Sequence, residues 1–365
     1  MDRRQFLQTL NANSVGVFLP ASAFLKGNPL GTTQAKLPSS VDESHSVQAD
    51  APAWDGPKIG IVSVGEIGRI GLPPRRNPDF KFLHLIRSIA VDTYSAEFDC
   101  IKADRKVRLD QSFFDPHDAG TFPEAILDAI AEAVAGLDMV ILIAEMGEGI
   151  GAAFSPTIAA HLKKLGILTL GVAVMPYLEE GPMRHVLART ALASLRGEVD
   201  ALLPVLSNDI DEFIPDWKRY EGILCPHYID SVYRNIVKPL CVPGWVNVEF
   251  TEVRHNTLNQ AGICTFGHGV SRAEVAAQQA AMNAMEHPAM GEWNLQQARS
   301  VLMSLEHGRD VLPHDIKLAI RSVRSRLAPD CHFLYGIAVF DTLQDVVQVN
   351  ILANGILDAN QRIAF

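Results

Sequence analysis

The sequence lacks a long apolar run: no stretch reaches the roughly 18 residues that a membrane-spanning helix needs. Positive charge is also scarce, because 32 Lys and Arg stand against 42 Asp and Glu, for a net charge of −10. A chain of that charge is repelled by nucleic acid and by anionic membranes. We therefore expect a protein with no direct membrane span and without nucleic acid as a main partner.

Cysteine is sparse and poorly placed for chemistry. The five cysteines are far apart, odd in number and form no C-x-x-C pair: Cys100, Cys225, Cys241, Cys264 and Cys331. This pattern argues against a disulfide framework and a structural zinc site, so we expect buried free thiols in a reducing compartment. The sequence also has no H-E-x-x-H motif, and we expect no metal held by the protein alone.

The most informative segment is residues 137–156, which contains a strand, a glycine-rich turn and the start of a helix. Residues 139–144 are continuously apolar, which is typical of a parallel strand covered on both faces. Gly147, Gly149 and Gly151 follow at alternate positions. Such a turn presents backbone N–H groups and the positive end of a helix dipole to an anion. The pattern indicates a site for a nucleotide phosphate.

Apolar strands alternate with amphipathic helices in the first part of the chain. We expect strands at residues 59–64, 86–91, 139–144, 167–174 and 200–206, and helices at 124–135, 155–165 and 183–195. This alternation predicts an α/β fold with a doubly wound parallel sheet. Ligands of such sheets bind at the carboxyl ends of the strands, where the turns after residues 64, 91 and 144 lie.

The pattern changes after Asn208. We expect a helix at residues 228–240, strands at 246–253, 259–266, 333–340 and 346–352, and further helices at 272–286 and 313–327. This order predicts a second, smaller α+β domain.

The N-terminus has two interpretations. R-R-Q-F-L at residues 3–7 resembles a twin-arginine export signal, and A-S-A at 21–23 resembles a cleavage site. Polar residues such as Asn11 and Asn13 interrupt the stretch between them. We therefore favour a leader without this function, in a cytoplasmic protein, over an exported one. Residues 26–56 have the composition of a linker.

Six segments carry a family resemblance that extends from residue 58 to residue 355. Residues 144–156, A-E-M-G-E-G-I-G-A-A-F-S-P, match the phosphate-loop signature A-G-M-G-G-G-T-G-T-G-A-A-P, and residues 176–184 match P-F-x-F-E-G-x-x-R. The other four segments are residues 158–175, 199–209, 243–253 and 267–273, the last as a glycine turn into a helix. In this order, the six segments resemble the FtsZ/tubulin superfamily, and FtsZ more than tubulin.

The resemblance implies a GTP-binding domain, a long central helix and a second domain. We expect these at residues 57–215, 216–242 and 243–365, after a leader and linker at residues 1–56. It also implies GTP and magnesium as cofactors. The implied partner is the same chain, in head-to-tail filaments where an acidic loop of one subunit completes the GTP site of the next.

The resemblance also implies site residues. The nucleotide contacts correspond to Gly65, Gly68, Asp92, Gly147, Glu148, Gly149, Ile150, Gly151, Glu180 and Arg184. The catalytic loop corresponds to Asn247, Glu249 and Glu252.

Several of these positions depart from the family pattern. Ile150 and Ala152 replace both threonines of the phosphate loop. Carboxylates occupy four loop positions that are neutral in the family: Glu66, Asp92, Glu145 and Glu148. A carboxylate about 4 Å from a phosphate charge costs roughly 4 kcal/mol at an effective dielectric constant of about 20. We therefore expect weakened or lost GTP binding, whereas tight binding would survive if these side chains pointed to solvent.

The catalytic loop and the C-terminus also differ from the family. Glu249 and Glu252 replace aspartates and are one methylene longer, whereas catalytic geometry tolerates about 0.5 Å of misplacement. We expect weakened hydrolysis and a role at a subunit interface. The sequence ends at Phe365, and we expect the tail that binds membrane-tethering partners in division proteins to be absent.

Three hypotheses follow. The first is an FtsZ-like cytoskeletal protein that assembles with weak or absent GTP hydrolysis, and the second is a working GTPase with an altered phosphate loop. The third, a dinucleotide-dependent oxidoreductase, requires G-x-G-x-x-G directly after the first strand. Because the glycines here follow a later strand as G-x-G-x-G, we rank it last of the three.

Overall fold

The computed structural model describes most of the chain after residue 55. The described residues are 56–65, 86–93, 98, 101, 103–109, 123–147, 149–211, 224–242, 244–259, 263–272, 276–290, 295–340 and 343–356, apart from the side chains of 211, 224–227, 230 and 234. From Pro57 on they belong to one compact unit. The leader and linker expected at residues 1–56 lie almost entirely outside the described residues.

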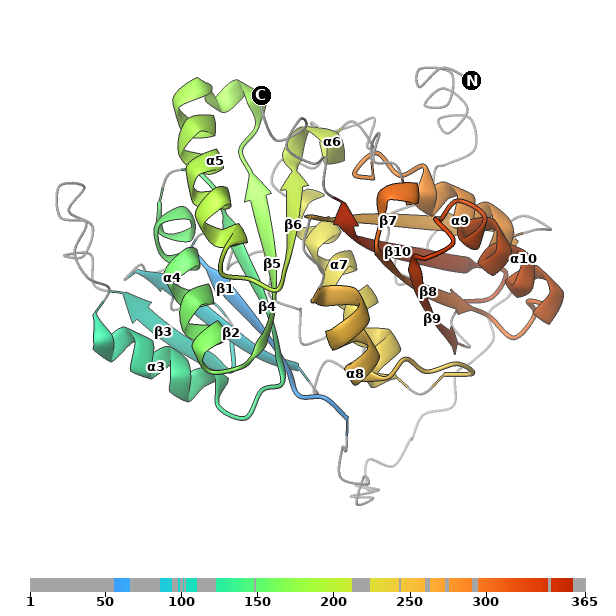
Figure 1. The fold of residues 1–365 in the computed structure, drawn as a ribbon, viewed down its shortest axis with the longest axis horizontal. Coiled ribbons are helices and arrows are strands. Elements are labelled where there is room, and N and C mark those ends of the chain that lie inside the picture. The colour runs from blue at the N-terminus through green and yellow to red at the C-terminus, as the bar shows by residue number, and fades with distance from the viewer. Residues whose placement is uncertain are drawn as a thin grey trace, which may run out of the picture. The chain divides into compact units, whose positions relative to one another are not determined.

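Six parallel strands form the first half of the described fold (Figure 1). They are β1 (Ile59–Val64), β2 (Ile86–Thr93), β3 (Arg105–Leu109), β4 (Met139–Glu145), β5 (Leu168–Met175) and β6 (Ala201–Leu206). Their order is β3-β2-β1-β4-β5-β6. The central strands β1, β4 and β5 are buried almost throughout, which explains why the sequence reads there as continuous apolar runs.

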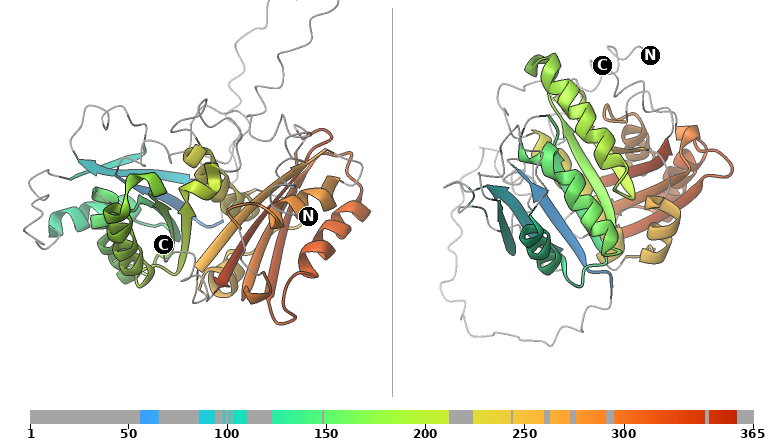
Figure 2. Two further views of the ribbon diagram at one scale, coloured as in Figure 1. Left: turned by 90° about the horizontal axis from the view of Figure 1, so that it is seen from above. Right: turned by 60° about the vertical axis from the view of Figure 1, so that its left-hand side comes forward.

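Helices cover both faces of this half. On one face lie α3 (Glu124–Val134), α4 (Ile150–Lys164) and α5 (Pro182–Arg196), which share a core with alternate residues of the strands. Figure 2 (right) shows α4 and α5 side by side across that face. The other face packs against α7 (Leu224–Cys241). The doubly wound parallel sheet predicted from the alternation of strands and helices is confirmed.

The second half of the sheet is mixed. It contains β7 (Ile263–Ser271), β10 (Val347–Ile356), β8 (Ser300–His307) and β9 (His332–Val339) in that spatial order. β10 is antiparallel to both of its neighbours, and β8 and β9 are parallel. On the face away from α7 lie α9 (Ala276–Met285) and α10 (Pro313–Arg324).

The two halves meet in two ways. A parallel pairing at Leu202 and Ile263 joins β6 to β7, so that the ten described strands form one sheet. The helix α7 packs against both halves, because one apolar core contains Ile61 and Ile141 of the first half together with Phe266 of the second. The long helix that the sequence predicts is therefore central to the fold. No described helix has the length and hydropathy that crossing a membrane requires.

The strand predicted at residues 246–253 is wrong. Only Val246 forms a bridge, with Ile337, and the chain continues into α8 (Phe250–Glu252) and a π-helical turn, η7 (Val253–Leu258). Four side chains of this helical segment face inward: Phe250, Val253, Thr257 and Leu258. Their i, i+3, i+7, i+8 spacing is helical. The next strand consequently begins at Ile263, later than the predicted residue 259.

The glycine turn predicted at residues 267–273 is also wrong, because residues up to Ser271 continue β7. The glycines have a packing role. A Cβ atom on Gly267 would overlap the carbonyl oxygen of Ala284, and one on Gly269 would overlap that of Ala280. Both carbonyls belong to α9, so the glycines let the strand and the helix approach closely.

Candidate functional site

The described loops of the predicted nucleotide site gather at one edge of the sheet. Because β1, β2, β4 and β5 are parallel, their carboxyl ends lie at the same edge of the sheet. In Figure 1 the arrowhead of β5 marks this edge at the top of the view. Gly65, Asp92, residues 145–147 and residues 149–151 follow or end these strands, as the sequence predicts. The 3-10 turn η5 (Leu178–Glu180) and the start of α5 complete the edge.

The phosphate-loop glycines are explained by backbone geometry. Gly147 has φ of 120° and Gly149 has φ of 101°, a region that other residues rarely adopt. A Cβ atom on Gly151 would lie 2.5 Å from the carbonyl oxygen of Glu145, so the first turn of α4 packs directly on the end of β4. Ile150, at the threonine position of the family, packs against the apolar core beneath the helix.

The loop after β1 reaches the same helix start. A Cβ atom on Gly65 would lie 3.2 Å from the backbone nitrogen of Gly151, and the Gly65 N–H donates to the carbonyl of Val91 at 2.9 Å. Asp92, buried at the end of β2, accepts a hydrogen bond from the Thr93 N–H at 2.7 Å. The structure thus brings Gly65 and Gly151 together. Gly68 and Glu148 lie outside the described residues, as does Glu66.

One arginine joins two carboxylates across the phosphate loop. Arg184 Nη2 donates to Glu145 Oε1 at 3.2 Å, and Arg184 Nε lies 3.0 Å from Glu180 Oε2, an ion pair without hydrogen-bond alignment. The three side chains are 32%, 30% and 27% exposed in the order Arg184, Glu145, Glu180. A Cβ atom on Gly147 would lie 2.9 Å from Arg184 Cγ, so the arginine lies across the loop.

Glu180 is held from several sides. Its Oε1 accepts a hydrogen bond from the Tyr177 N–H at 2.7 Å. The same turn is braced by Asn208, whose Oδ1 accepts from the Leu178 N–H at 2.9 Å, and by His185, whose Nε2 lies 2.9 Å from the Tyr177 carbonyl. The roles of Asn208 and His185 were not predicted. The position of Asn208 just after a buried strand was the available signal for it.

The predicted catalytic loop precedes and includes α8. The side chain of Asn247 accepts a hydrogen bond from the Gly244 N–H at 2.8 Å, so it closes a turn of its own segment. Glu249 and Glu252 are exposed and stand one helical turn apart, Glu249 as the N-cap of α8 and Glu252 as its last residue. Neither carboxylate has a hydrogen bond or ion pair within the described part of the chain.

The two predicted parts of the site lie at opposite ends of the described fold. Arg254, just after α8, donates to the carbonyl of Gly166 at 2.8 Å, and Gly166 precedes β5. The carboxyl end of β5 leads to Glu180 instead. Because β5 has 8 residues, about 25 Å of strand separates the two ends. In Figure 1, α8 accordingly lies at the bottom and α6 (Ser207–Asp211) at the top.

Comparison with known families identifies both halves. The family model described as "Tubulin/FtsZ family, GTPase domain" matches residues 79–214, and "FtsZ family, C-terminal domain" matches residues 262–357. The cell division protein FtsZ of Caulobacter vibrioides is 26% identical over 308 residues, which cover 82% of this chain. The chain is a divergent FtsZ-like protein.

Other relatives agree. FtsZ of Magnetospirillum gryphiswaldense is 24% identical over 309 residues. The alignments cover 60% of the Caulobacter protein and 54% of the Magnetospirillum protein, so the FtsZ-like chain spans little more than half the length of these relatives.

Solved structures show the same fold. A mutant of FtsZ of M. jannaschii superimposes with a TM-score of 0.70 at 23% identity, covering 82% of this chain and 92% of that one. "CetZ2 from Haloferax volcanii - GTPgS bound protofilament" superimposes with a TM-score of 0.63 at 17% identity, covering 84% and 96%. At these identities the likeness establishes the FtsZ/tubulin-type two-part α/β fold.

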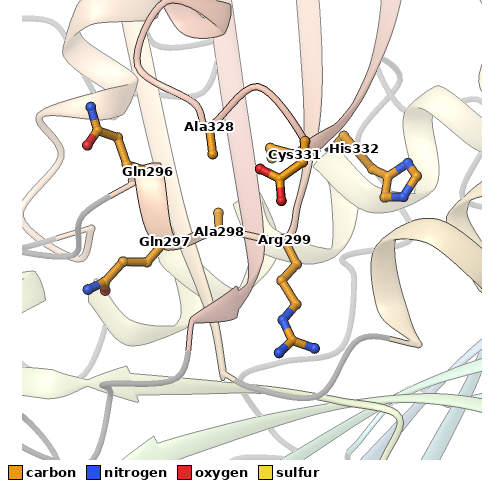
Figure 3. Close-up of a pocket in the computed structure, with 8 residues that line it drawn as sticks. Gln296, Gln297, Ala298, Arg299, Ala328, Cys331 and His332 are labelled. Atoms are coloured by element: carbon orange, nitrogen blue, oxygen red, sulfur yellow. Dashed lines mark hydrogen bonds between the residues drawn. The ribbon is translucent and has the colours of Figure 1, made fainter.

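A surface pocket of about 440 Å³ lies away from the predicted site residues of this FtsZ-like chain, at the amino ends of β8 and β9 (Figure 3). Its lining residues are Gln296, Gln297, Ala298, Arg299, Ala328, Asp330, Cys331 and His332. In Figure 3 the side chains of Arg299 and His332 point in different directions, so the polar groups do not converge. Burial raises the pKa of the Cys331 thiol, which makes it a poor nucleophile.

Proposed function

We propose that the chain is an FtsZ-like cytoskeletal protein that assembles head-to-tail, with GTP binding and hydrolysis weakened or lost. The observation that carries this proposal is the separation of the candidate site into two ends. Glu180 and Arg184 lie at the carboxyl edge of the sheet, whereas Glu249 and Glu252 lie near its amino edge. A complete site therefore requires one end of one copy to meet the other end of the next, which generates a filament.

The exposed apolar side chains support contacts at both ends. Of the eight large hydrophobic residues that are exposed within the described ranges, four lie at the edge with Arg184 and three at the edge with α8. The first group is Leu178, Met183, Val186 and Leu187, and the second is Leu165, Trp245 and Val246. Exposed apolar groups of this kind mark interaction surfaces, and two different groups favour a heterologous contact.

The nucleotide would meet a partly favourable site. The glycine loop, the start of α4, Glu180 and Arg184 fit the ribose and phosphates of GTP. Glu145 does not fit, because its carboxylate already forms an ion pair with the Arg184 guanidinium, the group that would face a phosphate. Ile150 supplies no hydroxyl for phosphate or magnesium. Together these features support weakened binding of GTP and magnesium.

Hydrolysis would depend on groups that the second copy provides. Glu249 and Glu252 are free to reach across a contact, since they are exposed at the two ends of the short helix α8. The side-chain oxygen of Asn247 already accepts a hydrogen bond from the Gly244 N–H within its own segment. The longer glutamate side chains support weakened rather than efficient hydrolysis.

A working GTPase of the same family is the second candidate. It is favoured by the intact match at Glu180 and Arg184 and by the solved CetZ2 neighbour, which is a GTPγS-bound protofilament. Either function would operate in the cytoplasm, where nucleotide is available. No observation favours an oxidoreductase, because the glycine loop follows β4 rather than the first strand.

The test combines binding with sedimentation. The purified full chain is titrated with GTP and magnesium in a calorimeter and sedimented with and without the nucleotide. We expect pelleting that does not depend on GTP and no saturable micromolar binding. Micromolar binding with GTP-dependent pelleting would establish the working GTPase instead, and no pelleting under either condition would overturn head-to-tail assembly.

A further inference from the structure

The sheet face beneath α7 changes from apolar to polar along the strands. Leu352 on β10 and Leu302 on β8 belong to the shared apolar core. Further along the same face lie Asn350 and Glu306, each only 2% exposed. Asn350 stands opposite His268 on β7 and opposite Ser304 on β8 in the strand register. A polar cluster is therefore buried at the base of the central helix.

An ion pair joins this cluster to α7. Lys238 Nζ, in the last turn of the helix, lies 2.6 Å from Glu306 Oε2, and the two side chains are 11% and 3% exposed. The ammonium group also lies 5.4 Å from the centre of the Phe340 ring. A buried ion pair is stable only when the remaining polar atoms of both groups are satisfied. Glu306 Oε1 nevertheless has no partner among the described residues.

Within the described part of the chain, Asn350 has an unpaired donor, whereas Glu306 has an unpaired acceptor. Its Oδ1 is hydrogen-bonded to His268 Nδ1, which must donate because an amide oxygen only accepts. Its Nδ2 is buried and has no acceptor among the described residues. Asn350 and Glu306 are diagonal neighbours on adjacent strands, with Cα atoms about 7–8 Å apart. A buried donor and a buried acceptor therefore stand close together and unpaired.

We propose that one buried water molecule bridges Asn350 Nδ2 and Glu306 Oε1. The bridging group must accept a hydrogen bond from the amide and donate one to the carboxylate, which water does and a metal cation does not. Ser304, opposite Asn350 on the same face, offers a third polar group, and buried waters typically make about three hydrogen bonds.

The bridge completes a network across four elements. It runs from His268 on β7 through Asn350 on β10 and the water to Glu306 on β8, and from there to Lys238 on α7. The carbonyl of Pro239, next in the helix, accepts a hydrogen bond from the Val248 N–H at 3.4 Å. The network thereby fixes the helix end from which the segment carrying Asn247 and Glu249 departs, and its residues are positioning residues for that segment.

A crystal structure of the full chain tests the bridge directly. We expect a water peak within hydrogen-bond distance of both Asn350 Nδ2 and Glu306 Oε1. A direct contact between the two side chains, or an empty space between them, would overturn the proposal.

A variant cycle measures the coupling. Asn350→Leu is made in the wild-type chain and in the apolar background Lys238→Met/Glu306→Leu, where the water has lost its acceptor. Asn350→Leu loses the hydrogen bond to His268 in both backgrounds, so this loss cancels when the two effects are compared. We expect the substitution to raise the unfolding equilibrium constant about tenfold more in the wild-type chain, because only there does it leave the water and the carboxylate unsatisfied. Equal effects in the two backgrounds would refute the bridge.

Hydrogen exchange tests the positioning role separately. We expect Asn350→Leu to speed amide exchange in residues 244–252, whereas exchange in β1 stays unchanged. If exchange rose equally in both segments, Asn350 would contribute to overall stability and would not position residues 244–252.

Discussion

Arg184 and Glu145 form an ion pair directly over the phosphate loop. The Nη2 and Oε1 atoms are 3.2 Å apart, and the arginine side chain passes over Gly147. An arginine in this place would otherwise be available to an external anion. Here its charge is shared between Glu145 and Glu180, so a phosphate must compete with a carboxylate that is already tethered to the protein.

Replacing Glu145 should therefore strengthen nucleotide binding. In Glu145→Ala the guanidinium loses one of its two carboxylates, and we expect GTP affinity in titration calorimetry to rise about tenfold, equivalent to about 1.4 kcal/mol. Glu198→Ala is the matched control, because Glu198 also pairs with a cation, Lys163, but precedes β6 at the opposite edge. Unchanged affinity in Glu145→Ala would contradict a competing role for this carboxylate.

Assembly should depend on apolar side chains at both ends. Trp245 is 59% exposed beside Asn247, and Met183 is 68% exposed beside Arg184. We expect Trp245→Ala and Met183→Asp each to raise the concentration needed for pelleting about tenfold, since Trp and Met are common anchors of interfaces. Ser194→Asp adds the same charge to the exposed side of α5, near its far end, and should leave pelleting unchanged. If Met183→Asp pelleted like Ser194→Asp, the first apolar group would not be part of the contact.

Stability should fall on mild acidification because of two histidines. Burial lowers the pKa of His287 to about 3 and lowers that of His268 as well. Below the ordinary value of about 6.5, the unfolded chain gains protons that the folded chain does not, so folding weakens as pH falls from about 6.5 toward about 3.

The size of this effect can be measured by denaturant unfolding. The His287 contribution amounts to about 1.4 kcal/mol per pH unit, or about 2 kcal/mol between pH 6.5 and pH 5. His287→Asn keeps an acceptor for the Ala289 N–H and should remove that part of the pH dependence. An equally steep loss in the variant would show that other groups cause it.

Gly269 should tolerate no side chain. A Cβ atom there would overlap the Ala280 carbonyl of α9, so Gly269→Ala must separate strand and helix and should cost about 1–3 kcal/mol of unfolding free energy. Gly197→Ala is the control, since its nearest contact, 3.6 Å away, is ordinary and its φ of −70° suits alanine. Similar unfolding midpoints for the two variants would refute the close-packing role of Gly269.

The sequence predicts the fold best where the apolar pattern is simple. The buried strands β4 and β5 and the amphipathic helix α10 were predicted within two or three residues of their observed ends. β8 was missed because Ser304, Glu306 and His307 interrupt its apolar run, although all eight residues are buried. Glu306 pairs with Lys238 of α7, and His307 Nδ1 is hydrogen-bonded to the carbonyl of Gly308. A local sequence pattern does not reveal the contact with α7.

The candidate site was predicted less completely. Glycine spacing and strand order placed Gly65, Gly147 and Gly151 at one edge, as observed. The pairing of Glu145 with Arg184 could not be predicted, because 39 residues separate them in the chain and their meeting depends on how α5 packs. The helical start of the catalytic segment was missed for a different reason, since the apolar pattern of residues 246–253 was interpreted as a strand.

The shared core beneath α7 has a mechanical consequence. The helix packs against both halves of the sheet in one apolar cluster, so a load applied near Arg184 reaches Glu249 through close-packed side chains rather than through a flexible joint. Each copy would then behave as a stiff link in a filament. Curvature would have to arise at the contacts between copies, and the side chains at the two ends, rather than the interior, would set how far a filament bends.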